Sequence, residues 1–176
     1  MTGRVVTAGF LALIGAAFLA HNRAVARGGI AVLTADEVRN FADSVLRLPR
    51  IKVPDGAAMI VRIAWIESRF DTSAVRSEPR INDASIGLMQ TLLGTARWLY
   101  DDLGFRHFAR PTVPNLMGPQ ASIYYGAAYL TYLSIYAGRA RSAEFVVRSY
   151  NGGPGNLSAA TADYWRKYLA AKERFG

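Results

Sequence analysis

The chain has 176 residues, of which 51% are hydrophobic and 19% are charged. This balance excludes a disordered polyelectrolyte and predicts a single folded domain with a substantial core. Cysteine is absent and histidine occurs only twice, so disulfide scaffolds, thiol nucleophiles and cysteine-based zinc sites are excluded.

The 21 basic residues outnumber the 13 acidic ones, which gives a formal net charge of +8. Such a charge favours an anionic partner, which would be a nucleic acid, an anionic lipid surface or a charged cell-wall polymer, although it can also serve solubility alone. The basic residues form no run of five, and no nucleic-acid-binding motif is recognisable. We therefore expect no nucleic-acid partner.

The first 28 residues are predicted to form a segment separate from the domain at residues 29–176. Residues 5–20 contain no charged side chain, and arginines flank them on both sides. As a helix this stretch would span about 24 Å, against about 30 Å for the hydrocarbon core of a membrane. Three interpretations stay open: a weak membrane anchor, the apolar part of a signal peptide cleaved near residues 24–26, and a buried core helix.

The rest of the chain is predicted to be almost entirely α-helical, because no stretch alternates apolar and polar residues over the length of a strand. Thr34 and Glu37 have the spacing of a capping box, and Asp55 is placed to cap a second helix that runs through Glu67. Arg62 of that helix is expected to face away from its apolar side. Further helices are expected at residues 86–100, 120–136, 143–150 and 161–175. Long loops are expected at residues 69–85, 104–118 and 152–160.

Glu67 is the catalytic candidate that helical periodicity identifies. Ile60, Ile63 and Ala64 form the apolar face of the second helix, and Glu67 is the next residue on that face. Burial disfavours a charged carboxylate and raises its pKa, as a general acid near neutral pH requires. The alternative is a glutamate at the edge of the core that pairs with an arginine such as Arg69 or Arg76.

Four short motifs follow one another from this glutamate onward. They lie at residues 67–70, 87–90, 126–130 and 149–152. In this order they resemble the soluble lytic transglycosylase (SLT) family of the goose-lysozyme-like superfamily, whose pattern is Glu-Ser-x-Phe, Gly-Leu-Met-Gln, Gly-x-x-Tyr-Leu and Ala-Tyr-Asn-x-Gly. The resemblance covers roughly residues 54–157, about three fifths of the chain. It implies an all-α, lysozyme-like domain that follows the N-terminal hydrophobic helix and acts on peptidoglycan.

By this resemblance Glu67 is the catalytic acid. The residues implied to bind the glycan are Met89, Gln90, Tyr150 and Asn151. Met89 is equally well explained as a core residue. The alternative for Tyr150 is a packing aromatic, but a phenol followed by Asn151 and a glycine-rich turn favours a role in the site. The resemblance also implies a serine near the acid, for which Ser77 and Ser85 are both candidates.

The implied reaction cleaves the β-1,4 bond between N-acetylmuramic acid and N-acetylglucosamine and leaves a 1,6-anhydro end. Glu67 acts first as acid and then as base, while Tyr150 and a serine hydroxyl hold its oxygens. No metal or organic cofactor is implied, and the partners are peptidoglycan strands. Two alternatives stay open: a lysozyme-type hydrolase in which Asp71 or Asp83 activates water, and a non-catalytic wall-binding or virion structural protein of the same fold.

The chain departs from the family pattern at three places. Extra residues, roughly 78–83, enter the loop after the acid, and residues 118–123 replace the family's Asp-Pro-Glu-x-Asn-Ile. The proline expected soon after the glutamine turn is missing. These departures concern substrate subsites and not the acid. The expected location is the bacterial periplasm or cell envelope, reached or held through residues 5–20, with a secretion system or a phage particle as the assembly.

Overall fold

The computed structural model describes residues 32–176, so the predicted N-terminal segment lies outside the described residues. In chain order the elements are α2 (Ala35–Leu46), α3 (Gly56–Ser68), β1 (Val75–Glu78), the short 3-10 turn η1 (Pro79–Ile81), β2 (Asp83–Ile86), β3 (Thr91–Leu92), α4 (Leu93–Asp101), α5 (Val113–Met117), α6 (Pro119–Ser134), η2 (Tyr136–Gly138), α7 (Ala143–Gly152) and α8 (Ala159–Phe175). Within residues 32–176, no helix combines the length and the apolar character needed to cross a bilayer.

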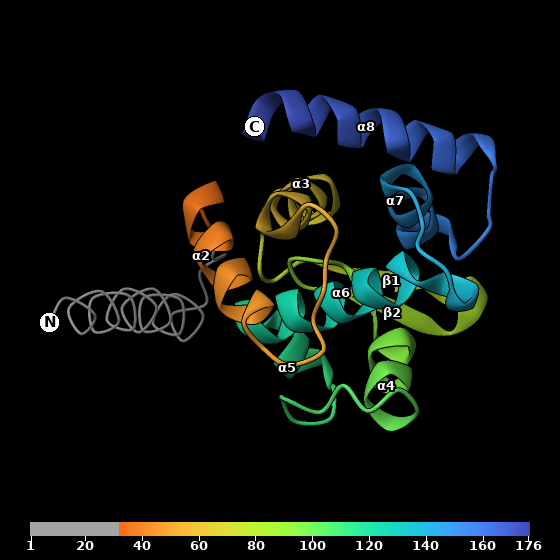
Figure 1. Ribbon diagram of the computed structural model, residues 1–176. Helices are drawn as coiled ribbons and strands as arrows, with labels where there is room; N and C mark the ends of the chain where they lie inside the picture. Colours follow the sequence, from red (N-terminus) through yellow and green to blue (C-terminus); the bar gives the residue numbers. More distant parts are fainter. Residues whose placement is uncertain (1–31) are drawn as a thin grey trace, which may run out of the picture.

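Helix α6 runs through the centre of the domain, and α2, α4, α5 and α7 pack around it (Figure 1). Its apolar stripe is fully buried and consists of Ile123, Ala127, Leu130 and Leu133. Helix α8 lies across α3 and α7 on the side of the molecule opposite α4. The core is therefore built around α6 and is closed over α3 and α7 by the C-terminal helix.

The N-terminal caps of α2 and α3 differ from each other. At α2 the predicted capping box is confirmed, because Thr34 Oγ1 accepts from Glu37 N at 3.2 Å and Glu37 Oε2 accepts from Thr34 N at 2.8 Å. Asp55 holds the N-cap position of α3, but its carboxylate makes no capping hydrogen bond and pairs with Arg62. The sequence therefore predicted where both helices start. It predicted the capping interaction correctly only for α2.

The predicted orientation of Arg62 is wrong. Its side chain is buried, because α2 and α8 pack against α3 and leave little of that helix in contact with water. Its guanidinium donates to Tyr168 Oη at 3.1 Å and to the carbonyl oxygen of Gly176 at 2.6 Å. Arg62 therefore fastens α3 to the C-terminal helix from inside the fold.

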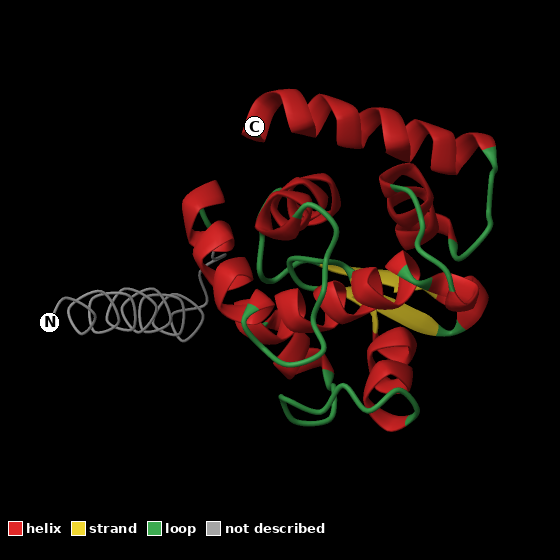
Figure 2. Ribbon diagram, viewed as in Figure 1, coloured by secondary structure: helices red, strands yellow, loops and turns green. Residues whose placement is uncertain are grey.

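A small antiparallel sheet begins in the segment predicted as a loop at residues 69–85 and ends with β3 at residues 91–92, within an otherwise helical molecule (Figure 2). Val75 pairs with Ile86 between β1 and β2, and Ser85 pairs with Leu92 between β2 and β3. Residues 75–77 are exposed, so β1 has no buried face to produce apolar alternation in the sequence. The loop prediction was wrong for that reason. The domain is mostly helical, as expected of a lysozyme-like fold.

Two other boundaries differ from the sequence prediction. The helix expected from residue 86 begins at Leu93, because residues 86–92 complete β2, form a turn and enter β3. The loop expected at residues 104–118 contains α5, whose cap is Thr112, with Oγ1 accepting from Asn115 N at 3.3 Å. Short elements of this kind depend on local capping and tertiary contacts more than on periodicity.

The turn at residues 87–90 is fixed by close backbone contact. Gly87 has φ +71°, and a Cβ at this position would lie 2.1 Å from the carbonyl oxygen of Leu116 and 2.9 Å from Ser122 Oγ. Gly87 N donates to the carbonyl oxygen of Ala74 at 2.7 Å, and Met89 N donates to Ser122 Oγ at 3.1 Å. Only glycine fits here, for reasons of both backbone angle and space.

Replacing Gly87 by alanine is expected to lower the free energy of unfolding by roughly 3 kcal/mol or more, since overpacking adds to the strain of the left-handed backbone. Gly138→Ala is the matched control, because Gly138 has φ +72° and nothing lies within 4 Å of the position that its Cβ would take. That variant should lose about 1 kcal/mol. Urea denaturation measures both values, and equal losses would contradict the role assigned to the contact with Leu116.

Candidate active site

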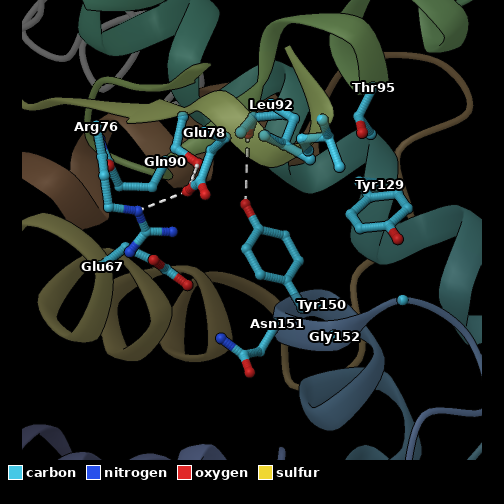
Figure 3. Close-up of a pocket in the computed structure, with 14 residues that line it drawn as sticks. Glu67, Arg76, Glu78, Gln90, Leu92, Thr95, Tyr129, Tyr150, Asn151 and Gly152 are labelled. Carbon is cyan, nitrogen blue, oxygen red and sulfur yellow. Dashed lines mark hydrogen bonds and ion pairs between the residues drawn. The ribbon is translucent and has the colours of Figure 1, made fainter. Parts of the chain in front are cut away.

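A cleft of about 390 Å³ opens between the end of α3, the sheet and the end of α7, which is a usual size for a ligand site (Figure 3). Its lining residues come from most elements of the domain and are Glu67, Arg76, Glu78, Ile81, Ser85, Gln90, Thr91, Leu92, Thr95, Tyr129, Tyr150, Asn151, Gly152 and Gly153. In Figure 3, Glu67 and Arg76 lie toward one end, Thr95 and Tyr129 toward the other, and Tyr150 between them.

Glu67 lies in the last turn of α3 and is half-buried. Ile60, Ile63 and Ala64, which precede it on the same helical face, are fully buried. Tyr164 of α8 donates from Oη to Glu67 Oε1 at 2.6 Å. The carboxyl group is thus held between a buried phenol and the open cleft.

Burial raises the pKa of Glu67 above the ordinary value, because loss of hydration disfavours the carboxylate. The hydrogen bond from Tyr164 and the positive charges of Arg76 and Lys167 lower the same pKa by smaller amounts. Burial and the negative charge of Glu67 together hold the pKa of Tyr164 well above its ordinary value. Tyr164 therefore remains a donor, and Glu67 retains its proton to a higher pH than an exposed glutamate does.

The turn at residues 87–90 connects the acid to the opposite wall of the cleft. Ser68, next to Glu67, donates from Oγ to the carbonyl oxygen of Leu88 at 2.9 Å. From the other side, Tyr150 donates from Oη to the carbonyl oxygen of Met89 at 2.8 Å. The end of α3 and the end of α7 are therefore both bound to consecutive carbonyls of one turn, which sets their separation.

The hydroxyl that binds Glu67 belongs to Tyr164 and not to Tyr150. The Tyr150 hydroxyl is directed at the turn and lies 3.4 Å from Thr91 Oγ1 (Figure 3). Burial and the nearby Glu67 raise the pKa of Tyr150, so its phenol also stays neutral. Its ring contacts that of Tyr129 at a centroid distance of 5.6 Å, which places two aromatic side chains along the cleft.

Three further predicted residues lie in the cleft. Gln90 donates from Nε2 to the carbonyl oxygens of Ala74 and Gly87, each at 2.9 Å. Both amide hydrogens are therefore used on backbone carbonyl oxygens, and the amide oxygen is left for a ligand. Ser85 donates from Oγ to Glu78 Oε1 at 3.2 Å. Asn151 is exposed at the rim.

The structure places Met89 and Ser77 away from the cleft. The Met89 side chain is fully buried against Gly126, where an added Cβ would lie 2.8 Å from three of its atoms. Ser77 lies in a separate hollow that also includes Asp83. Residues on a strand alternate between two faces, so Ser77 turns away while its neighbours face the cleft.

Arg76 and Glu78 are cleft residues that sequence reasoning missed as a pair. Arg76 Nε lies 2.6 Å from Glu78 Oε1, and this ion pair lowers the pKa of Glu78. The two residues share one face of β1, a signal that was hidden because β1 was not recognised as a strand. Tyr164 was missed because it lies 97 positions from Glu67 and follows the helical spacing of an ordinary core residue.

The aspartates proposed to activate water in a hydrolase lie elsewhere. Asp71 accepts from the backbone nitrogen and the hydroxyl of Ser73 at 2.8 and 2.7 Å. Asp83 accepts from Gly94 N at 3.0 Å and lines the separate hollow that contains Ser77. Glu78 is therefore the carboxylate that shares the cleft with Glu67. Among residues 32–176, no group of three or more histidine, aspartate and glutamate side chains is arranged to hold a metal ion.

Replacing Arg76 by glutamine is expected to raise the pKa of Glu67 further. The change removes a positive charge that favours the carboxylate, and it also leaves the negative charge of Glu78 without its partner. Carbon-13 NMR titration of the Glu67 carboxyl group measures the shift directly. Arg110→Gln is the control, because Arg110 forms a similar exposed ion pair with Asp101 outside the cleft. An unchanged Glu67 titration in Arg76→Gln would contradict the electrostatic coupling.

No curated protein matches the chain, and no solved structure matches it either. A family model described as the Transglycosylase SLT domain matches residues 55–170. The matched range contains Glu67, the turn at residues 87–90, every lining residue of the cleft and Tyr164. Since this match covers well over half of its residues, the chain belongs to the transglycosylase SLT domain family.

Proposed function

We propose that the protein is a peptidoglycan lytic transglycosylase that cleaves the β-1,4 bond between N-acetylmuramic acid and N-acetylglucosamine. Membership of the SLT family implies a peptidoglycan substrate and action outside the cytoplasm. The observation that carries the finer proposal is Glu67, a half-buried carboxyl group with a raised pKa at the edge of the cleft. A group of this kind is suited to general acid catalysis near neutral pH.

In the proposed reaction Glu67 first gives its proton to the glycosidic oxygen. The bond from that oxygen to C1 of the muramic acid breaks, and the sugar's own acetamido oxygen stabilises the positive charge that develops at C1. The Glu67 carboxylate then takes the proton of the C6 hydroxyl while O6 attacks C1. A 1,6-anhydro ring closes, the acid is regenerated and no water is consumed.

The surroundings of Glu67 fit both halves of this cycle. Burial favours the protonated form at the start. The Tyr164 hydroxyl and the nearby charges of Arg76 and Lys167 stabilise the carboxylate that forms in between. A group that must act as acid and then as base needs both states to be accessible near the working pH, and these opposing influences supply that balance.

A second candidate function is hydrolysis, and the observation that supports it is the position of Glu78. Glycosidases that use water usually employ two carboxylates, one as acid and one as base or nucleophile. Glu78 lies in the same cleft as Glu67, and Arg76 keeps it ionised by lowering its pKa. One of its oxygens is already bound to Arg76 and Ser85, which restricts its freedom to activate water. We therefore place hydrolysis second.

Replacing Glu67 by glutamine is expected to lower the rate of peptidoglycan clearing at least about 100-fold, since the amide cannot donate a proton to the leaving oxygen. Glutamine preserves the side-chain shape and the acceptor for Tyr164, so the melting temperature should change little. Glu173→Gln is the matched control, because Glu173 is an exposed glutamate near the end of α8. Clearing at the wild-type rate by Glu67→Gln would overturn the assignment of the acid.

Product analysis by mass spectrometry separates the two reactions. A transglycosylase releases fragments that end in 1,6-anhydro-muramic acid, and a hydrolase releases reducing ends. We expect anhydro ends from the wild type and from Glu78→Gln. Reducing ends from the wild type, together with loss of activity in Glu78→Gln, would instead support hydrolysis with Glu78 as the base.

Replacing Tyr164 by phenylalanine is expected to lower kcat roughly tenfold, which corresponds to about 1.4 kcal/mol, a reasonable contribution for a hydrogen bond to a charged group. The pKa of Glu67 should rise, because the lost bond favours the carboxylate, and the alkaline limb of the rate profile should move to higher pH. Tyr168→Phe is the control: Tyr168 is also a buried tyrosine of α8, but its hydroxyl accepts from Arg62. Identical pH profiles for wild type and Tyr164→Phe would contradict this positioning role.

A further inference from the structure

A second depression, here called the α3–α8 groove, lies between the last turns of α3 and α8 and encloses about 350 Å³. Its basic lining residues are Arg69, which follows α3, and Lys167 and Arg174 from α8, and no acidic residue is among the described residues that line it. Lys167 is paired with Asp163 at 2.9 Å. Within residues 32–176, no carboxylate pairs with Arg69 or Arg174. The groove is therefore a concentrated positive surface on a chain of net charge +8.

The indole ring of Trp65 forms a rigid base for these charges. It packs against Phe70 and Phe175 at centroid distances of 5.4 and 5.6 Å. The guanidinium carbons of Arg69 and Arg174 lie 4.4 and 4.3 Å from the Trp65 ring centroid. Stacking of this kind uses the face of a guanidinium and leaves its in-plane edge for a carboxylate, which can bind there through two hydrogen bonds. Arg69 Nη1 donates to the carbonyl oxygen of Trp65 at 3.0 Å, so the edge that remains for a ligand on Arg69 is formed by Nε and Nη2.

The groove begins one residue from Glu67, because Ile66 of α3 lines it. Lys167 lines the groove, and its charge also acts on Glu67. Tyr164, one turn earlier on α8, is the residue that donates to the Glu67 carboxyl group. From Lys167 to Arg174 the helix rises about 10 Å, and an extended peptide of about three residues spans the same distance. A short peptide that enters the groove at Lys167 can therefore reach Arg174.

We propose that the α3–α8 groove binds the carboxylates of a peptidoglycan stem peptide whose glycan strand occupies the cleft, with Arg69 and Arg174 as the binding residues. The inference rests on the proposed function, since the stem is attached to the muramic acid at which Glu67 acts. The attachment raises the effective concentration of the stem at a groove that starts one residue from the acid. The positive charge of the groove complements the carboxylates that such stems carry, which favours this occupant over a neutral sugar chain.

The test compares two substrates: peptidoglycan with its stem peptides, and glycan chains from which an amidase has removed them. For Arg174→Gln we expect kcat/KM to fall roughly fivefold to tenfold on the stem-bearing substrate, mainly through KM, and to stay at the wild-type value on stem-free chains. Lys172→Gln is the matched control, because Lys172 is an exposed basic residue of the same helix outside the groove. It should retain wild-type rates on both substrates.

Other outcomes overturn the proposal. Equal losses on both substrates would mean that Arg174 acts on the cleft or on the fold, which the melting temperature distinguishes, and no loss on either would remove the groove as a binding site. Weaker binding of Arg174→Gln to vesicles containing phosphatidylglycerol, with no effect of the stems, would assign the groove to a lipid surface.

Failure of the proposed function is recognised separately. If the wild type cleaves neither substrate, binding is measured with Glu67→Gln protein on immobilised stem-bearing and stem-free chains. A preference for stem-bearing chains that disappears in the Glu67→Gln, Arg174→Gln double variant would still support the groove, and its absence would overturn it.

Discussion

The site depends on one short turn, residues 87–90, to which three helices are hydrogen-bonded and against which a fourth packs. Ser68 at the end of α3 and Tyr150 of α7 donate to its carbonyl oxygens. Ser122 of α6 accepts from its backbone, and α5 contributes the carbonyl oxygen that would clash with any side chain at Gly87. Because these contacts involve backbone atoms at close range, the turn cannot shift without displacing the helix that carries the acid or the helix that faces it.

The chemistry of Glu67 is set by a balance between burial and nearby positive charge. Burial is the larger influence and keeps the proton on, whereas Tyr164, Arg76 and Lys167 limit how strongly it is held. The residues that tune the acid come from α8 and from β1, and neither element carries one of the four sequence motifs. The motifs specify the geometry around Glu67, and the elements outside them adjust its proton affinity.

Helix α8 has two roles in this arrangement. Its buried side contributes Tyr164 to the acid and Tyr168 to Arg62, so it holds α3 in place from inside the fold. Its outer side contributes Lys167 and Arg174 to the α3–α8 groove. Part of the excess of basic residues is therefore concentrated near Glu67, on a surface that an anionic wall polymer would approach.

Periodicity was sufficient to locate most of the helices, because a helix that buries one face repeats its apolar residues regularly. It also identified Glu67, which interrupts that repeat, and the order of the motifs identified the family. They also identified Gln90, Ser85, Tyr150 and Asn151, all of which line the cleft. Tertiary structure alone decided the rest: that Met89 packs inward, that β1 directs Arg76 and Glu78 to the cleft and Ser77 away, and that Tyr164 holds the acid. Some of these features depend on contacts between segments far apart in the chain, which no local sequence pattern encodes. The others depend on a strand whose exposed residues show no alternation of apolar and polar side chains.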